Sequence, residues 1–202
     1  MSLAQKMRNR MRRILQAYGP KKIKSYLWDN EFSRGRWDCL EATPGDVVYP
    51  YVERYADKGS ILDLGCGSGN TGNELALSAY RDYIGIDISA VAIEKAKTRT
   101  IGNQRSGKNA YSQSDIFSYT PTKRFNVILF RDSLYYVPAA RIKPMLDRYT
   151  SYLDMRGVFI ARMYGGSETY GAIVETISTH FTVVETYLSD APKAIVLVFR
   201  KT

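Results

Sequence analysis

Short apolar runs alternate with helical patterns from about residue 44 to the end of the chain. The runs have the length of strands, and the segments between them carry apolar residues three or four positions apart. This alternation predicts an α/β fold with a doubly wound, mostly parallel sheet. Seven strands are expected, at 61–64, 83–88, 109–113, 125–130, 157–163, 181–188 and 194–200.

The intervening segments predict helices whose starts are marked by proline or by capping residues. Pro44 and Pro144 are expected in the first turns of their helices, and Ser89 is expected to cap another. The segment 189–193, which includes Pro192, is short and therefore predicts that the last two strands form an antiparallel hairpin. The helices are expected at about 44–55, 70–78, 90–98, 144–153 and 168–178.

The first helical pattern, residues 3–18, is amphipathic. Its apolar positions recur at steps of three and four residues, and Gly19-Pro20 ends it. We expect a helix that lies with its apolar side on the body and its basic side in solvent. Two alternatives stay open: an arm for an anionic partner, either a membrane surface or RNA, and a cleaved transit peptide. The apolar stripe consists of Leu3, Met7, Met11, Ile14, Leu15 and Tyr18.

Charge is concentrated in the same region. The chain carries a net charge of +9, and residues 1–24 hold eight basic residues and no acidic one. The rest is nearly neutral, which argues against nucleic-acid binding by the body. Two cysteines, Cys39 and Cys66, make no disulfide framework, and no apolar run approaches the ~18 residues of a membrane span. A cytoplasmic location is expected, and the oligomeric state stays open.

A glycine-rich loop follows the first expected strand. Gly65, Gly67 and Gly69 alternate directly after the apolar run, and helix-start residues follow at Asn70 and Thr71. Strand, glycine turn and helix start together direct unpaired backbone N–H groups at a ligand. The dinucleotide pattern G-x-G-x-x-G that starts at Gly65 has Asn70 where its third glycine belongs, so a pyrophosphate is not the favoured ligand.

The string D-L-G-C-G-S-G-N at 63–70 resembles motif I of the class I S-adenosylmethionine-dependent methyltransferases. The resemblance covers about residues 45–202 and includes the C-terminal antiparallel hairpin. It implies a domain at 45–202 that binds S-adenosyl-L-methionine and releases S-adenosyl-L-homocysteine, with residues 1–44 as a helical lid and substrate segment. In the loop, the implied cofactor-binding residues are Asp63, Gly65, Cys66, Gly67 and Asn70.

Two further acidic positions match the family. Asp87 ends the second expected strand 22 residues after Gly65, where a carboxylate can accept from both ribose hydroxyls, and Ile88 follows it. Asp115-Ile116 resembles the adenine site of the family. The alternatives are a helix-dipole partner for Asp87 and a turn residue for Asp115. The resemblance also implies that the backbone at Phe130 or Arg131 holds the amino group of the cofactor.

The methyl acceptor should meet the cofactor beside the turn after the fourth strand. Asp132, Tyr135 and Tyr164 are the expected catalytic residues, and Arg36, Trp37 and Tyr136 are expected in the substrate pocket. For each, ordinary packing is the alternative. Residues 131–134 lack the N-P-P-Y or D-P-P-Y pattern of enzymes that methylate exocyclic amines of nucleic acids. His180 is the only histidine and is expected to be structural, and no metal site is expected.

These features together predict methyl transfer to an oxygen or nitrogen of a small molecule by in-line displacement. The runner-up is an RNA or protein methyltransferase that uses the basic arm. An NAD(P)-dependent reductase is less favoured, because Pro121 interrupts its Tyr119–Lys123 pair. A non-catalytic cofactor-binding protein is the fourth alternative.

Overall fold

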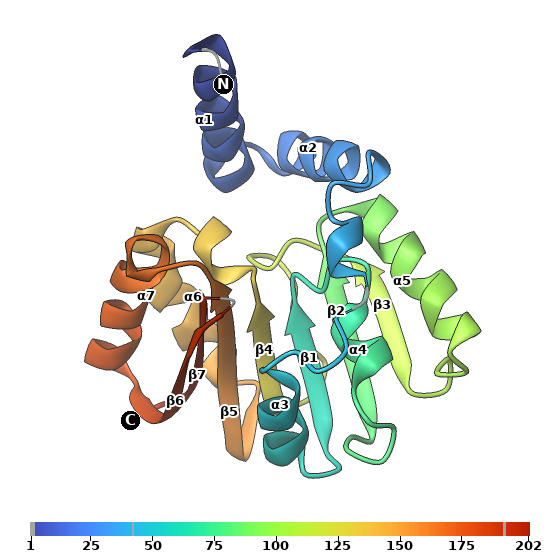
Figure 1. The fold of residues 1–202 in the computed structure, drawn as a ribbon. Coiled ribbons are helices and arrows are strands. Elements are labelled where there is room, and N and C mark those ends of the chain that lie inside the picture. Colours follow the sequence, from blue (N-terminus) through green and yellow to red (C-terminus); the bar gives the residue numbers. More distant parts are fainter. Residues whose placement is uncertain (1–2, 42, 192) are drawn as a thin grey trace.

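A computed structural model describes residues 3–41, 43–191 and 193–202 (Figure 1). One seven-stranded sheet has the order β3-β2-β1-β4-β5-β7-β6, and its pairs are parallel except those that β7 makes with β5 and β6. The predicted α/β fold with a C-terminal antiparallel hairpin is therefore confirmed. The strands are β1 Ser60–Leu64, β2 Asp82–Asp87, β3 Asn109–Gln113, β4 Phe125–Arg131, β5 Leu153–Tyr164, β6 Thr182–Asp190 and β7 Lys193–Arg200.

Helices cover both faces of this sheet and its upper edge (Figure 1). Two cores result, because α3, α4 and α5 pack on one face and α6 and α7 on the other. The helices are α1 Leu3–Tyr18, α2 Lys21–Ser33, α3 Tyr49–Ala56, α4 Asn70–Glu74, α5 Ala90–Gly102, α6 Ala139–Thr150 and α7 Ser167–His180, with short 3₁₀ helices η1 Asp38–Leu40 and η2 Leu134–Tyr136. None of the helices in the described ranges is long and apolar enough to span a bilayer.

The central strands explain where a ligand can bind. All five residues of β1 are buried, as expected of a parallel strand that is covered on both faces. The carboxyl ends of β1, β2 and β4 meet at one edge, above which α2 lies in Figure 1. Binding sites of doubly wound sheets form at this edge, at the point where the strand order reverses.

Several predicted boundaries are wrong. The helix expected from Pro44 begins only at Tyr49, because the Asp46 carboxylate accepts the Val48 N–H at 3.0 Å and holds a turn there. The helix after the glycine loop ends at Glu74 rather than near 78. Pro144 lies inside α6, which begins at Ala139. The buried stripe of this helix outweighs the hydrogen bond that the proline removes. Pro192, expected in the last connection, lies outside the described residues.

The orientation of α1 also differs from the prediction. Most of the expected stripe faces solvent, with exposed fractions of 66% for Met7, 59% for Met11 and 70% for Tyr18, whereas Leu15 is half-buried. Two polar residues of α1, the buried Gln16 and the half-buried Arg12, contact Glu31 of α2 instead. The expectation that the apolar side lies on the body is therefore wrong. The contacts of these polar residues with Glu31 determine which side of α1 faces inward. The side chain of Leu3 lies outside the description.

Candidate functional site

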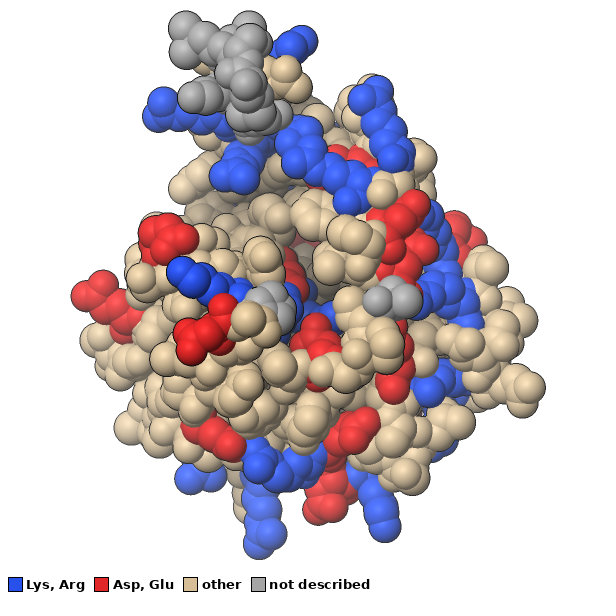
Figure 2. Space-filling model, in the orientation of Figure 1, with Lys and Arg blue, Asp and Glu red and all other residues tan. Residues whose placement is uncertain are grey.

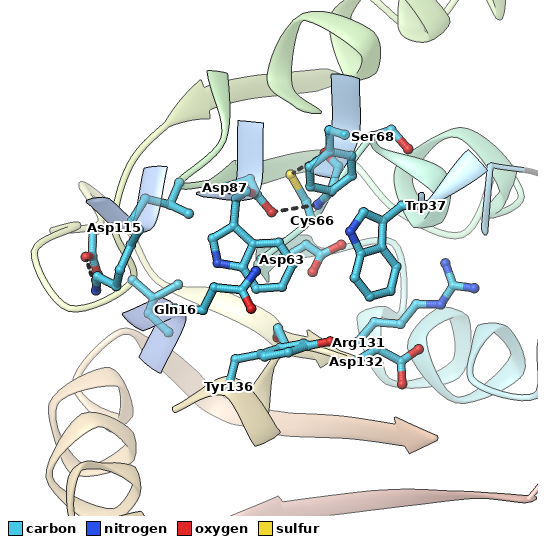
Figure 3. A pocket seen from close by; sticks show the side chains of 18 of the residues that line it. Gln16, Trp37, Asp63, Cys66, Ser68, Asp87, Asp115, Arg131, Asp132 and Tyr136 are labelled. Atoms are coloured by element: carbon cyan, nitrogen blue, oxygen red, sulfur yellow. Dashed lines mark hydrogen bonds and ion pairs between the residues drawn. The ribbon is translucent and has the colours of Figure 1, made fainter. Parts of the chain in front are cut away.

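A cavity lies at the carboxyl ends of β1, β2 and β4, and residues of α1 and α2 contribute to its lining. Figure 3 shows lining side chains from close by. Its walls come from the glycine loop, from the residues that follow β2, β3 and β4, and from the N-terminal segment. Thirteen of the residues predicted for the site line it: Trp37, Asp63, Gly65, Cys66, Gly67, Asn70, Asp87, Ile88, Asp115, Ile116, Arg131, Asp132 and Tyr136.

The glycine loop wraps the end of β1 in backbone conformations that favour glycine. Gly65 and Gly67 have φ values of 86° and 54°. The N–H of Gly65 donates to the Ile86 carbonyl at 2.9 Å, so the loop is tied to β2. A Cβ at Gly67 would meet the ring of Phe32 at 3.5 Å, which shows how closely α2 covers this part of the loop. From α5, the guanidinium of Arg99 contacts the side chain of Asn70.

Asp87 joins this loop to the start of α5. Its Oδ2 accepts the Gly67 N–H at 3.0 Å, and its Oδ1 accepts the Ser89 N–H at 2.8 Å. Burial raises the pKa of the Asp87 carboxyl to about 6, although these backbone hydrogen bonds oppose the rise. A carboxylate oxygen offers two lone pairs, so each oxygen can still accept from a ligand hydroxyl in the cavity. Ser89 caps α5 as predicted, since its Oγ accepts the Ala92 N–H at 3.1 Å.

Asp63 is the deepest carboxylate of the cavity. It is 1% exposed, the hydroxyl of Tyr83 donates to its Oδ2, and its Oδ1 has no hydrogen-bond partner among the described residues. Burial raises the pKa of the Asp63 carboxyl to about 7. A buried acceptor without a partner is costly. This oxygen therefore fits a ligand that brings a donor, above all a cationic one.

The side chain of Asp115 contacts helix α2 of the lid. Lys24 of α2 donates from Nζ to Oδ2 at 2.7 Å, and the Phe117 N–H donates to Oδ1 at 2.9 Å. Both side chains of the ion pair are nearly buried, with 10% exposed for Lys24 and 9% for Asp115. The expected adenine site thus has a cationic neighbour that the sequence analysis did not include.

These observations test whether the residues suit the cofactor implied by the resemblance. The glycine loop offers backbone close to the cavity, Asp63 offers an orphan acceptor for an ammonium group, and Asp87 offers acceptor positions for a diol. S-adenosylmethionine carries both groups. The cavity therefore fits it.

A buried cluster of four charges borders the other side of the cavity. Arg131 pairs with Asp46 at 2.6 Å, and Arg162 pairs with Asp132 and lies 3.7 Å from Asp46. Asp132 also accepts the Tyr164 N–H at 2.9 Å and has a φ of 55°. Burial raises the pKa of the Asp132 carboxyl, while the charges of Arg162 and Arg131 oppose the rise. Asp132 is thus held firmly at the cavity wall.

Four predicted site residues do not line the cavity. Tyr164 is 54% exposed, and Tyr135 packs against the core that α6 and α7 form. The side chain of Phe130 is fully buried in the same core, which leaves only its backbone for the predicted role. Arg36 lies near the carboxylate of Glu31 at 3.9 Å and outside the lining. Lys123 pairs with Asp82 at the start of β2, at the opposite edge of the sheet, so the reductase pair does not reach the cavity.

Aromatic rings from the lid roof the cavity. Trp28 lies 5.9 Å from Trp37 and meets Tyr136 edge to face at 4.8 Å between ring centroids. Phe32 lies 6.5 Å from Trp37. Such edge-to-face and tilted contacts stabilise aromatic clusters beyond the area they bury. The roof is mainly aromatic, with Gln16 and Lys24 as polar members, and Asp63, Asp87 and Asp115 line the floor.

Polar residues of α2 hold this lid in place. Glu31 accepts from Gln16 and from the indole N–H of Trp37, both at 3.0 Å, and pairs with Arg12 at 3.1 Å. Asp29 accepts from the Ser89 hydroxyl at 2.7 Å, next to the start of α5. The roles of Glu31 and Asp29 were not predicted, because the segment that contains them shows no clear hydrophobic period. Two acidic residues amid aromatic ones, Asp29 and Glu31, were the available signal.

Comparisons with known proteins agree with this geometry. A profile of the family described as "Methyltransferase domain" matches residues 56–189. A curated relative, 27-O-demethylrifamycin SV methyltransferase of Amycolatopsis mediterranei (strain S699), is 25% identical over 119 residues. That alignment covers 55% of this chain and 44% of the relative, so the chain matches less than half of the relative's length.

Solved structures share the fold over most of the chain. Magnesium protoporphyrin IX methyltransferase from Synechocystis PCC 6803, with bound S-adenosylmethionine, superposes with a TM-score of 0.70 at 15% identity, covering 90% of this chain and 97% of that one. The N-methyltransferase NodS from Bradyrhizobium japonicum WM9, in complex with S-adenosylhomocysteine, gives 0.68 at 16% identity, with coverages of 86% and 98%. The profile spans well over half of this chain. The seven-stranded sheet and the glycine loop at 65–69 are consistent with that family. The chain belongs to the class I S-adenosylmethionine-dependent methyltransferase family, whose methyl donor is S-adenosylmethionine.

Proposed function

We propose that this methyltransferase acts on an oxygen or nitrogen of a small-molecule acceptor. The roofed cavity is the observation that carries the proposal. Trp28 from the lid contacts both Trp37 and the Tyr136 ring of the body, and Glu31 accepts a hydrogen bond from the Trp37 indole. Ligand pockets that bury small molecules are apolar with a few polar groups, as this one is. An extended polymer would need an open groove instead.

The cofactor is assigned to the floor of the cavity. Asp63 would accept from its ammonium group, Asp87 from its ribose hydroxyls and Asp115 from its adenine amine. The glycine loop at Gly65 and Gly67 would lie against its methionine part, with Cys66 and Asn70 beside them. When bound, the cofactor supplies a methyl group that its sulfonium makes electrophilic.

The chain contributes position and exclusion of water. Alignment of two reacting atoms supplies ~7–11 kcal/mol, so the protein needs little covalent chemistry of its own. Asp132, fixed by Arg162 beside the cavity, would accept a proton or hydrogen bond from the acceptor. The aromatic roof of Trp28, Trp37 and Tyr136 would hold the acceptor and keep out solvent.

Named relatives support this class of acceptor. The curated relative is named for methylating 27-O-demethylrifamycin SV, and the structure of NodS is described as that of an N-methyltransferase. Both names describe those proteins. They favour a small-molecule acceptor and leave oxygen and nitrogen equally open.

Labelled cofactor tests the proposal directly. The protein is incubated with methyl-labelled S-adenosylmethionine and, in separate reactions, a small-metabolite fraction, total RNA and a protein fraction. We expect label in one low-molecular-weight product and titratable binding of S-adenosylhomocysteine but not of NADH. Label in RNA or protein, with none in the small-metabolite reaction, would refute the assignment of a small acceptor.

A further inference from the structure

The outer face of α1 is apolar and has no cover among the described residues. Met7, Met11, Ile14 and Tyr18 recur at helical steps of four, three and four residues and so lie on one side. Their exposed fractions are 66%, 59%, 46% and 70%. Scattered exposed apolar residues are ordinary, whereas a contiguous stripe marks an interaction surface.

The opposite side of α1 explains why the stripe must face outward. Gln16 is 5% exposed and donates to Glu31 at 3.0 Å, and Arg12 pairs with the same carboxylate at 3.1 Å. A rotation that buried the stripe would leave the carboxylate of Glu31, itself 5% exposed, without these partners. Glu31 would keep the Trp37 N–H but lose its neutralising Arg12, and removing the partner of a buried charge costs several kcal/mol. The outward stripe is therefore built into the contact between α1 and α2.

Cations flank the stripe. Arg8 follows Met7 and Arg10 precedes Met11, so the two exposed guanidinium groups lie on opposite sides of it. Residues 1–24 contain eight basic residues and no acidic one. Figure 2 shows Lys and Arg gathered around the upper part of the molecule, where α1 and α2 lie, whereas both signs are mixed over the lower body.

These charges decide between occupants of the stripe. A second copy that packed its α1 on this one would bring arginines together with no carboxylate on either helix to pair with them. RNA would pair with the arginines and leave the four apolar side chains in water. An anionic lipid surface satisfies both, because the acyl region takes the apolar side chains and the headgroups take the cations.

We propose that α1 binds an anionic phospholipid bilayer by inserting its Met7–Met11–Ile14–Tyr18 stripe, with Arg8 and Arg10 on the headgroups. The same helix borders the cavity through Gln16 and Ala17. A bound bilayer would then lie about one helix diameter, roughly 10 Å, from the cavity. The proposal is independent of which acceptor is methylated.

Sedimentation with vesicles tests it on the full chain. The vesicles contain about one third phosphatidylglycerol in phosphatidylcholine, and the controls are pure phosphatidylcholine. We expect retention on the anionic vesicles alone, weaker at about 0.5 M salt than at about 0.1 M. Met11→Asp should lower retention at least about tenfold, the effect of keeping one large apolar side chain in water. Arg10→Gln should lower it roughly fivefold.

Met155→Asp is the matched control, because Met155 is 91% exposed near the start of β5 and far from α1. It should bind vesicles like the parent protein, and the three variants should keep its affinity for S-adenosylhomocysteine. Equal retention on neutral vesicles, or a Met11→Asp protein that binds like the parent, would overturn the proposal. Two other results would also overturn it. One is that no vesicle retains the protein while it binds RNA, with or without Met11→Asp. The other is that the protein forms a dimer and Met11→Asp abolishes that dimer.

Discussion

The replacement Asp63→Asn tests the electrostatics at the floor of the cavity. Asp63 is fully buried, receives a hydrogen bond from Tyr83 and has one oxygen without a partner among the described residues. Asparagine has nearly the same shape and keeps an acceptor for Tyr83 but carries no charge. The variant therefore removes the ionisation and little else.

The magnitude follows from the pKa of this carboxyl. Burial raises it from 3.8 to about 7, against the hydrogen bond from Tyr83 and the charge of Arg131. Between these two values the folded protein holds a proton that the unfolded chain has released, so the free energy of unfolding falls as pH rises from about 4 to about 7. At about 1.4 kcal/mol per pKa unit, the full loss is roughly 4 kcal/mol.

Urea unfolding at pH 5 and pH 8, without ligand, measures the part of this loss that falls above pH 5, roughly 3 kcal/mol. Asp63→Asn should lose much less stability than the parent protein between the two values, and at pH 8 it should be the more stable protein. Asp87 adds a pH-dependent loss of stability of its own in the parent and in the variant, since burial raises its pKa to about 6. Binding of S-adenosylhomocysteine should weaken by roughly 1.5–3 kcal/mol, because a charged acceptor for the ammonium group is lost.

Asp82→Asn serves as the control carboxylate. Asp82 is partly buried, but hydrogen bonds from Lys123 and Arg81 outweigh that burial and lower its pKa, so it is ionised at both pH values. In Asp82→Asn, the free energy of unfolding should change between pH 5 and pH 8 by the same amount as in the parent protein. A full parental loss of stability in Asp63→Asn would refute the reasoning, because the loss would then come from other groups.

Three further variants test the cavity. Asp87→Ala should weaken binding of S-adenosylhomocysteine by about 1–3 kcal/mol in isothermal titration, and parental affinity would contradict the ribose assignment. Lys24→Met should lower the free energy of unfolding by about 3–5 kcal/mol by stranding the buried Asp115 carboxylate. Adding Asp115→Asn should restore much of it, and a double variant no more stable than the single one would count against the pair. Asp132→Asn should lower kcat roughly 100-fold at saturating cofactor with unchanged affinity for S-adenosylhomocysteine, and an unchanged kcat would remove Asp132 from the chemistry.

The fold of the body was predictable because burial imposes regular patterns. The strand 125–130 is a continuous apolar run, and it forms β4 at the centre of the sheet. Strand 109–113 was predicted with its observed bounds. The start of α6 was misplaced because the rule for prolines in first turns assigned Pro144 to the start, whereas Pro138 precedes the first residue of the helix.

The floor of the cavity was predictable for a related reason. Asp63, Asp87 and Asp115 follow the ends of parallel strands or lie in them, and the topology brings such ends to one edge. Tyr135 was misplaced because a turn directs neighbouring side chains to different sides: Tyr136 lines the cavity, whereas Tyr135 packs on the core. Only the three-dimensional course of the turn distinguishes them.

A lid at residues 1–44 was expected, but the contacts that hold it escaped prediction because they are single polar pairs between distant segments. Lys24 reaches Asp115 across 91 residues, and Asp29 reaches Ser89 across 60. The hydrophobic periodicity of a sequence does not indicate which distant polar residues will pair. The same contacts explain why α1 shows its apolar stripe to solvent, since Glu31 selects the polar side of that helix.

A lid held by hydrogen bonds and ion pairs has a consequence for ligand entry. When Lys24 and Asp29 leave their partners, water can solvate the separated groups, whereas a lid held only by apolar contacts would expose its whole buried face. The free-energy cost of separating each of these polar pairs is therefore smaller than expected from how deeply the pair is buried. We therefore expect the lid to open for a nucleoside-sized ligand and to close over it. Closure would return the carboxylates of the floor to a surrounding of low dielectric constant, which strengthens their hydrogen bonds to a cationic ligand.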